Sequence, residues 1–518
     1  MSDPTEPEVM SGFDGEEQEG PRIEFYGGRG MSAIPIAFFI LWAIAQTALW
    51  RISDTEGLVA GMLIGLILGM FFAKGNWKTY ANTIFEGMTQ PVAVTAIVAW
   101  LWAGMFAETL QVGGFVDGLV WLADATGVGA VLFPALTFVL AAVLATGIGT
   151  GYGTTIAFVT LFFPAGVLLG ANPVLLFGSI LSGAIFGDNL APVSDTTIVS
   201  AVTQDSDIGG VVASRFKYAI IAAAIAFAGY LLAGSVMPGI EVAGDAQQAL
   251  LEGSQPIGLV HLLSMAMVIG TAVAGRHIVE AISWGIVTAV VLNVALGLST
   301  AAEIVVFRAP VDAPFSEPLA FLPILEVVED PEAVGVGGSI LDGAVGFFAL
   351  SILVLLIIAA AQIMIRGGAF QAILDWSIDR LATNVRNAEL TMVGSSALIN
   401  AVITINTAAE VAIGPFISKV GERFNINGYR RANILDAQTS ALGYIFPWSG
   451  GVLVGFTAMS ELPGQYDWFT ADMVVNPVEV VPFVFHGWLL VAVFVLAAIT
   501  GFGREYLTDR ESEEVARI

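Results

Sequence analysis

Polar and ionisable side chains gather within an apolar region at residues 186–197, in the sequence FGDNLAPVSDTT. Carboxylate and hydroxyl oxygens are ligands that hard cations prefer, and a desolvated carboxylate can exchange a proton for a cation near neutral pH. An alternative role is capping of broken helices, which fits Asp195 best because a half-helix could begin there. The residue types predict a cation or proton site. Its candidates here are Asp188, Ser194, Asp195, Thr196 and Thr197.

Three more stretches combine polar residues with apolar flanks: ATGIGTGYGTT at 145–155, TINTAAE at 404–410 and LDAQTSALGYIFPWSGG at 435–451. Ionisable side chains at membrane depth are energetically costly, so those present there are functional candidates by default. Helix capping is again the alternative for each carboxylate. These stretches add Thr150, Thr154, Asn406, Thr407, Glu410, Asp436 and Thr439 to the candidate cation and proton ligands.

Proline and glycine residues in the same stretches predict interrupted helices. Pro192 and Pro447 each remove an N–H donor and free the carbonyl four residues earlier, at Asp188 and Gly443. Backbone that is broken at membrane depth must be buried in protein or line a wet cavity. We expect helix breaks at Gly187, Pro192, Gly443 and Pro447.

The composition identifies the class of protein that holds these residues. Of the 518 residues, 56% are hydrophobic and 12% are charged, and apolar runs recur along the whole chain. We therefore expect an all-α polytopic protein of the cell membrane, with about fourteen apolar elements and no cleavable signal peptide. The chain has no Cys and three scattered His, so no metal motif or resident cofactor is expected.

Charge adds two further expectations. The net charge is −26, and the acidic residues lie mainly in the tails and loops. Acidic surfaces keep proteins hydrated, so we expect a salt-loving organism such as a halophilic archaeon, with an ordinary acidic tail as the alternative. Basic patches are lacking, so nucleic acid is not expected as a partner.

The two halves of the chain resemble each other. The segment that begins at Ile84 matches the one from Ile340, and ILSGAIFGDNLAPVSD from Ile180 matches ILDAQTSALGYIFPWSG from Ile434. Lys and Arg, which favour the cytoplasmic side, occupy opposite loops in the two copies. This pattern predicts inverted-topology repeats with re-entrant hairpins and broken transmembrane helices, the architecture of many secondary transporters.

The repeats define the expected domain organisation, with both termini cytoplasmic. Segments GGFVDGLVWLAD and GAFQAILDWSIDRL are amphipathic and should lie along the membrane interface, braced by Trp121 and Trp376. The expected parts are an acidic tail at 1–30, a first membrane repeat at 31–240, an extracellular linker at 241–256, a second membrane repeat at 257–502 with an acidic extracellular loop at 299–342, and an acidic tail at 503–518.

At this point the sequence resembles a known family. GTGYGTT followed by SGAIFGDNLAPVSDTT is similar to the first-half motif of the NhaC family of sodium/proton antiporters. The resemblance covers about 32–502 and implies paired hairpins and broken helices. It points to residues 150–154 and to Gly187, Asp188, Pro192 and 194–197. The second half departs from the family pattern, with LDAQTS, PWSGG and INTAAEVAIGP at the matching places, so the identity of the substrate is left open.

Two transport hypotheses follow. In the first, the protein exchanges sodium for protons by alternating access; sodium binds Asp188, Ser194, Asp195 and Thr196, and Asp188 or Asp436 carries the proton. In the second, it is a sodium- or proton-coupled carrier or exchanger of an organic anion or amino acid. A passive channel and a membrane enzyme fit less well, because broken elements suit an occluded site and no nucleophile elbow or metal motif is present. The expected partners are the lipid bilayer, sodium ions and protons, and a homodimer is compatible with this architecture.

Overall fold

The computed structural model describes residues 22–52, 54–75, 77–240 and 254–507. In this part of the chain, nine helices are long and apolar enough to cross a membrane. The prediction of an all-α polytopic membrane protein is confirmed. Most of the expected linker at 241–256 and most of both acidic tails lie outside the described residues.

Helices follow one another through the first half with short connections. Many are apolar around their whole circumference, as helices surrounded by lipid and protein require. They are α1 (Ile34–Ile44), α2 (Thr55–Phe72), α3 (Trp77–Met88), α4 (Pro91–Val112), α5 (Phe115–Thr126), α6 (Phe133–Ile148), α7 (Gly151–Leu168), α8 (Pro173–Leu190), α9 (Asp195–Val202) and α10 (Ile208–Val236).

The second half begins with two helices and a small sheet, and then continues with a similar helical series. Its helices are α12 (Leu262–Val273), α13 (Ile278–Leu296), α14 (Ala301–Ile304), α15 (Ser316–Leu319), α16 (Ser339–Val345), α17 (Phe348–Arg366), α18 (Ala369–Arg380), α19 (Val385–Ile403), α20 (Asn406–Arg423), α21 (Gly428–Leu442), α22 (Gly450–Gln465) and α23 (Phe485–Thr500).

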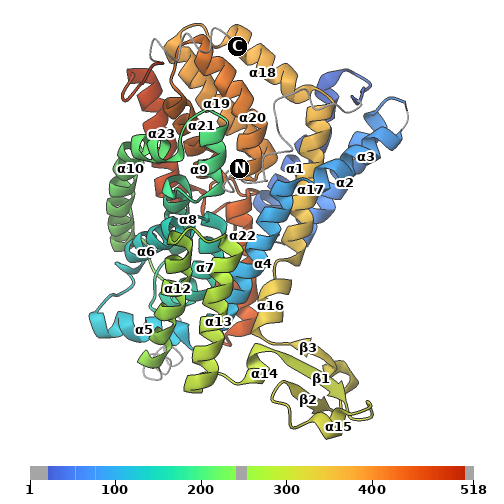
Figure 1. Ribbon diagram of the computed structural model, residues 1–518, viewed down its shortest axis with the longest axis vertical. Coiled ribbons are helices and arrows are strands. Elements are labelled where there is room, and N and C mark those ends of the chain that lie inside the picture. Colours follow the sequence, from blue (N-terminus) through green and yellow to red (C-terminus); the bar gives the residue numbers. More distant parts are fainter. Residues whose placement is uncertain (1–21, 53, 76, 241–253, 508–518) are drawn as a thin grey trace, which may run out of the picture.

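The helical series α6 to α10 recurs as α19 to α23. The starts of α7, α8 and α9 precede those of α20, α21 and α22 by the same offset in sequence. α5 lies at the end of the molecule that carries the sheet, whereas its counterpart α18 lies at the opposite end (Figure 1). Counterparts at opposite ends are what an inverted repeat requires.

Both halves contain a helix that breaks at a proline. Pro192 lies between α8 and α9, and Pro447 lies between α21 and α22. Gly187, which we expected at a break, instead lies inside α8, and a Cβ there would come within 2.2 Å of Ala145 Cβ on α6. The physical role of Gly187 is therefore close helix packing, and the break follows at Pro192.

The two predicted hairpins are α6–α7 and α19–α20, and their tips have related backbone geometry. Gly149 and Thr404 end the first helix of each hairpin with φ of 71° and 65°. A β-branched residue in the left-handed region is uncommon and strained. The strain at Thr404 preserves at the second tip a turn that glycine makes easily at the first.

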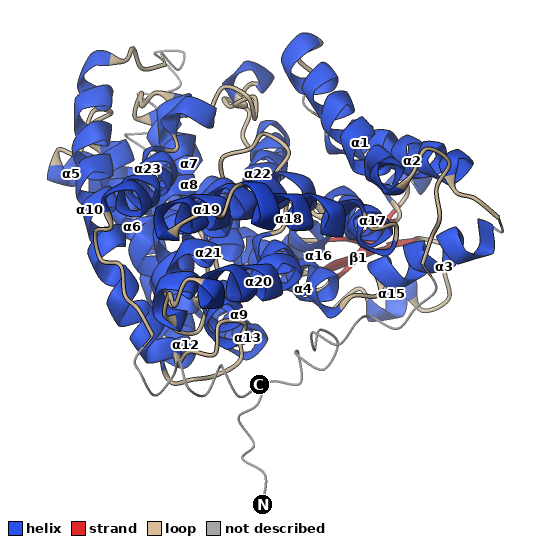
Figure 2. Ribbon diagram, turned by 90° about the horizontal axis from the view of Figure 1, so that it is seen from above, coloured by secondary structure: helices blue, strands red, loops and turns tan. Residues whose placement is uncertain are grey.

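A three-stranded sheet, which the sequence did not predict, lies in the loop at 299–342. Its strands are β1 (Val306–Pro310), β2 (Leu325–Val328) and β3 (Gly335–Gly337), in the order β2-β1-β3. β1 pairs in parallel with β2 and antiparallel with β3. Figure 1 shows this sheet projecting beyond the helices at one end. Seen from above, α1, α2 and α3 lie to one side and α5, α6 and α10 to the other (Figure 2).

Candidate functional site

The candidate site lies where the broken helices meet the hairpin tips. α9 packs against α20 and α21, and α7 packs against α22, so elements of both halves surround the site. Ser194 and Ser449 form the N-terminal caps of α9 and α22. The tertiary structure thus brings together polar segments that are far apart in the sequence.

The carbonyls freed by the two prolines have partners inside the protein. The Asp188 carbonyl accepts a hydrogen bond from Thr196 Oγ1 at 3.3 Å, and the Gly443 carbonyl accepts one from the Gly451 N–H at 3.0 Å. The following half-helix therefore bridges each break. Side-chain oxygens are therefore more available to a cargo ion than these two carbonyls are.

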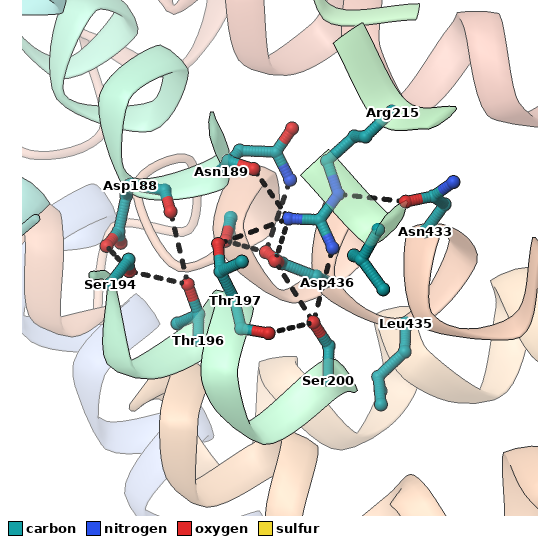
Figure 3. Close-up of polar contacts among 12 residues, drawn as sticks. Asp188, Asn189, Ser194, Thr196, Thr197, Ser200, Arg215, Asn433, Leu435 and Asp436 are labelled. Carbon is teal, nitrogen blue, oxygen red and sulfur yellow. Dashed lines mark hydrogen bonds and ion pairs between the residues drawn. The ribbon is translucent and has the colours of Figure 1, made fainter. Parts of the chain in front are cut away.

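Asp188 is buried, and three neutral donors hold its carboxylate. Ser194 Oγ donates to Oδ1 at 2.9 Å (Figure 3). Asn406 Nδ2 and the Tyr444 hydroxyl donate to Oδ2 at 2.8 and 3.0 Å. Tyr152 supports this arrangement by donating to Asn406 Oδ1 at 2.8 Å. Donated hydrogen bonds favour the ionised carboxylate, whereas burial without a basic partner opposes it. Residues from both repeats thus set the charge state of Asp188.

Asp195 lies in contact with a small cavity between the two hairpin tips. The Thr407 hydroxyl donates to Asp195 Oδ2 at 2.6 Å, and the Asp195 side chain also accepts from the Thr196 N–H at 3.0 Å. The cavity has a volume of about 100 Å³, and Thr150, Tyr152 and Thr407 line it together with Asp195. Asp195 is the first residue of α9, directly after the cap residue Ser194, and its side chain accepts from an N–H of the first turn. It also offers oxygen atoms to the cavity, so a role at the helix start and a role in the cavity are compatible.

Asp436 has a different environment, because it forms an ion pair with Arg215. Both side chains have no exposed surface. Ser440 Oγ and Asn189 Nδ2 donate to Asp436 Oδ1 at 2.6 and 3.2 Å, and Ser200 Oγ donates to Oδ2 at 3.3 Å. Asp436 therefore has a basic partner and three further hydrogen-bond donors inside the protein.

Arg215 also fastens the broken helix to its neighbours. Its guanidinium donates to the Asn189 carbonyl at 2.5 Å, to Ser200 Oγ at 3.2 Å and to Asn433 Oδ1 at 3.0 Å (Figure 3). The sequence analysis did not identify Arg215 as a site residue, although its side chain is fully buried. The available signal was its position inside the 29-residue helix α10, close to the start of the apolar run.

Glu410 forms a third polar cluster with Thr439 and Asn400. Thr439 Oγ1 donates to Glu410 Oε1 at 2.6 Å, and Asn400 Nδ2 donates to the Thr439 carbonyl at 2.9 Å. Within the described residues, Glu410 Oε2 and Asn400 Oδ1 are buried and have no hydrogen-bond partner. Two orphaned oxygens in one buried cluster can be satisfied by a proton, a cation or a water molecule.

The remaining candidates contribute less to these clusters. Thr154 Oγ1 donates to the Thr150 carbonyl at 2.9 Å, within its own helix. Thr197 Oγ1 accepts from Arg215 at 3.3 Å and so belongs to the Asp436 cluster. Thr150 caps α7, where its hydroxyl accepts from the Gly153 N–H at 3.4 Å. Sequence reasoning missed Arg215, Asn189, Ser200, Tyr444 and Asn400 as neighbours of the carboxylates.

The model of the Na+/H+ antiporter family matches residues 28–235 and 201–488. The chain belongs to the Na+/H+ antiporter family. This match covers both halves that carry the site, and it confirms the prediction of a membrane antiporter of the NhaC type. Family members are transporters, so the chain is assigned to transport rather than to enzymatic catalysis.

Individual relatives are distant. The chain is 24% identical to the arginine/ornithine antiporter ArcD of Halobacterium salinarum, over 89% of this chain and 92% of that protein. It is 23% identical to the Na+/H+ antiporter NhaC of Alkalihalophilus pseudofirmus, over 30% of this chain and 34% of that protein. The solved structure of Neisseria gonorrhoeae MtrF aligns over 89% of this chain and 94% of that chain, with a TM-score of 0.43 and 11% identity. So low a score carries no argument about this chain.

Proposed function

We propose that the chain exchanges sodium for protons, with sodium bound between Asp188 and Asp195 and assisted by Ser194 and Thr196. One observation carries the proposal. In the described part of the chain, the fully buried basic side chain in this group of carboxylates is Arg215, and it is paired with Asp436. Arg276 also lines the cavity beside Asp195, but it is largely exposed and lies 3.8 Å from Glu280. Asp188, Asp195 and Glu410 then share negative charge that a cargo cation or proton must compensate. No resident cofactor is needed, because sodium and protons are the cargo.

The different environments support a division of labour among the carboxylates. Asp436 already has a positive partner, so it serves to position α8, α9 and α21. Asp188 is held by three donors and suits an ionised ligand of sodium. Among the residues that the structure describes, Glu410 accepts from Thr439 alone and its Oε2 has no partner, so we assign the proton to Glu410 in place of Asp188 or Asp436.

Opposed repeats support an alternating-access cycle. Hydrogen bonds of Asp188, Asp195 and Asp436 join α8 and α9 of one half to α20 and α21 of the other, whereas the Glu410 cluster lies within the second half. Sodium entering near Asp195 would draw α8 and α9 toward α20 and α21. In the return step, a proton on Glu410 would neutralise the charge of the Glu410 carboxylate. A small relative movement of the halves would then expose the site to either side.

Purified protein in proteoliposomes tests this assignment. Removing a charged ligand loses about 1.5–3 kcal/mol. We therefore expect Asp188→Asn and Asp195→Asn to weaken sodium binding and sodium-driven proton flux by roughly tenfold to a hundredfold. Glu410→Gln should still bind radioactive sodium but should release no proton on binding. Asp375→Asn, at an exposed position on α18, is the matched control and should behave as wild type.

Undiminished exchange in Asp188→Asn and Asp195→Asn would contradict the sodium site. Normal proton release in Glu410→Gln would contradict the proton assignment alone. The two parts of the proposal can thus fail separately.

Amino-acid exchange is the second candidate, because an arginine/ornithine antiporter aligns with nearly the whole chain. The same carboxylates could hold a cationic amino acid in place of sodium. Proteoliposomes loaded with ornithine distinguish the candidates when radioactive arginine is added outside. Arginine uptake that needs internal ornithine would favour this second function, and sodium/proton exchange without amino acids would favour the first.

We also propose that both ends of the chain are cytoplasmic and that the sheet is extracellular. The distribution of Lys and Arg supports this orientation, because α18 ends at Arg380 and α19 has Arg386 in its first turn, whereas α5 and its flanks carry no basic residue. A homodimer stays a prediction with no surface assigned to it.

A further inference from the structure

A basic cavity lies at the end of the molecule that carries α18. It has a volume of about 720 Å³, within the range of small-ligand pockets, and it lies between the N-terminal segment, the end of α2 and the turn between α17 and α18. Arg22, Arg29, Lys74 and Arg366 line it, with Glu24 as the acidic member. Arg366 is paired with Glu86, and Arg29 and Lys74 still outnumber the single acidic residue Glu24. That excess is unusual in a chain with 45 acidic and 19 basic residues.

The start of α18 forms one wall of the cavity. Gly368 caps this 12-residue helix with φ of 79° and provides no side-chain capping bond, and of the first-turn N–H groups the Ala369 N–H donates to Ser32 Oγ at 3.3 Å. A Cβ on Gly368 would lie 3.2 Å from Arg29 Cδ, so the Arg29 side chain lies directly against the helix start. Helix N-termini carry partial positive charge and backbone N–H donors that bind anions.

The inverted repeat supplies an internal comparison. At the start of α5, the counterpart of α18, Asp117 provides an acidic side chain in the first turn. Aligning Gly113-Gly114 with Gly367-Gly368 places Asp117 opposite Gln371, which lines the cavity. The first turn of α18 contains no acidic residue. One copy of the repeat therefore carries its own anion, whereas the other has a neutral amide and a basic cavity at the same place.

The position of the cavity in the membrane protein indicates which kind of molecule could supply an anion at the start of α18. α2 ends at Phe72 and α17 ends at Arg366, so the cavity lies where membrane-crossing helices reach the interface. Ile23, Phe25 and Ile365 add apolar lining beside the basic groups. This combination matches a phosphate headgroup with its attached glycerol and acyl chains. We propose that this cavity binds the phosphate of an anionic lipid, at the place that Asp117 fills in the other repeat.

Native mass spectrometry of the purified full-length protein tests this proposal with phosphatidylglycerol and phosphatidylcholine as probes. We expect wild type to retain phosphatidylglycerol in preference to phosphatidylcholine. Gln371→Asp restores the internal anion of α5 and should weaken phosphatidylglycerol binding roughly tenfold or more. Gln371→Ala keeps the position neutral and should bind as wild type.

A second pair of variants separates the cavity from general surface charge. Arg29→Ala with Lys74→Ala should weaken phosphatidylglycerol binding as Gln371→Asp does. Arg380→Ala with Arg423→Ala removes the same charge from exposed positions outside the cavity and should leave binding unchanged. Equal phosphatidylglycerol binding by wild type, Gln371→Asp and the Arg29/Lys74 variant would overturn the proposal. Displacement of the lipid by millimolar inorganic phosphate would overturn the lipid assignment and identify a free-phosphate site.

Discussion

Four acidic residues near the helix breaks occupy four different environments. Asp188 accepts hydrogen bonds from three neutral donors, Asp436 is paired with Arg215, and Glu410 keeps one oxygen without a described partner. Asp195 combines a bond to a first-turn N–H of α9 with contact to a cavity. All four side chains are carboxylic acids, so their neighbours decide which of them can bind and release a cation or a proton.

The ion pair of Arg215 and Asp436 leads to a prediction about stability. Either Arg215→Gln or Asp436→Asn leaves a buried charge uncompensated, so each should lower the free energy of unfolding by about 3–5 kcal/mol. Replacing both by apolar residues, Arg215→Met with Asp436→Leu, should recover much of this loss. Thermal unfolding in detergent measures the effect. Removal of the exposed pair by Arg308→Gln should change stability by about 1 kcal/mol or less. Equal effects of Arg215→Gln and Arg308→Gln would contradict this account.

Close packing fixes the helices that carry these residues. α8 lies against α6 through glycines, because a Cβ on Gly183 would come within 2.5 Å of Ala141 Cβ. A Cβ on Gly187 would also come within 2.3 Å of the Thr146 backbone nitrogen. The first hairpin and the first broken helix therefore behave as one packed unit. Asp188 follows Gly187 directly, so this packing fixes where its carboxylate lies.

Glycine substitutions distinguish packing from local helix propensity. Gly187→Ala should destabilise the protein by about 1–3 kcal/mol through overpacking, because backbone atoms of α6 cannot move away easily. Gly394→Ala lies in α19 with open space around the added methyl group, so it should be neutral or stabilise by up to about 1 kcal/mol. Thermal unfolding of the two variants under identical conditions provides the comparison. A stabilising Gly187→Ala would show that α6 and α8 are not in close contact.

At the scale of the whole molecule, the two repeats are related in architecture but not in polar chemistry. Breaks at Pro192 and Pro447 and hairpin tips at Gly149 and Thr404 recur in both halves. The carboxylates recur only in part, and Asp117 in α5 is replaced by Gln371 in α18. The shared architecture supplies opposed elements that can move, whereas the differences assign separate tasks to the halves.

The orientation of the molecule can be tested because the natural chain has no cysteine. Asp330→Cys lies in the connection between β2 and β3, and Arg380→Cys lies at the end of α18; both positions are exposed. In intact cells, we expect a membrane-impermeant maleimide to label Asp330→Cys and to label Arg380→Cys only after permeabilisation. The reverse pattern would invert the proposed topology. Labelling of both positions in intact cells would show that they do not lie on opposite sides of the membrane.

Local features of the sequence were sufficient to predict that the protein is a membrane protein and that helices break at Pro192 and Pro447. Apolar run lengths predicted the spans, because a helix must match the thickness of the bilayer. Pro192 and Pro447 predicted the breaks, because proline removes a donor wherever it stands. Asp188, Asp195, Glu410 and Asp436 were candidates because an ionisable group at membrane depth needs compensation.

Only the tertiary structure decided which groups provide that compensation. Arg215 and Asp436 are far apart in sequence, and no local pattern states that they pair. Gly187 was expected at a helix break because glycine is common in turns, yet its neighbours on α6 make it a packing position. The short strands at 306–337 escaped prediction because three to five residues give too little periodicity. By itself the sequence determined which residues need partners, and three-dimensional packing determined the partners, because such contacts depend on the positions of whole helices.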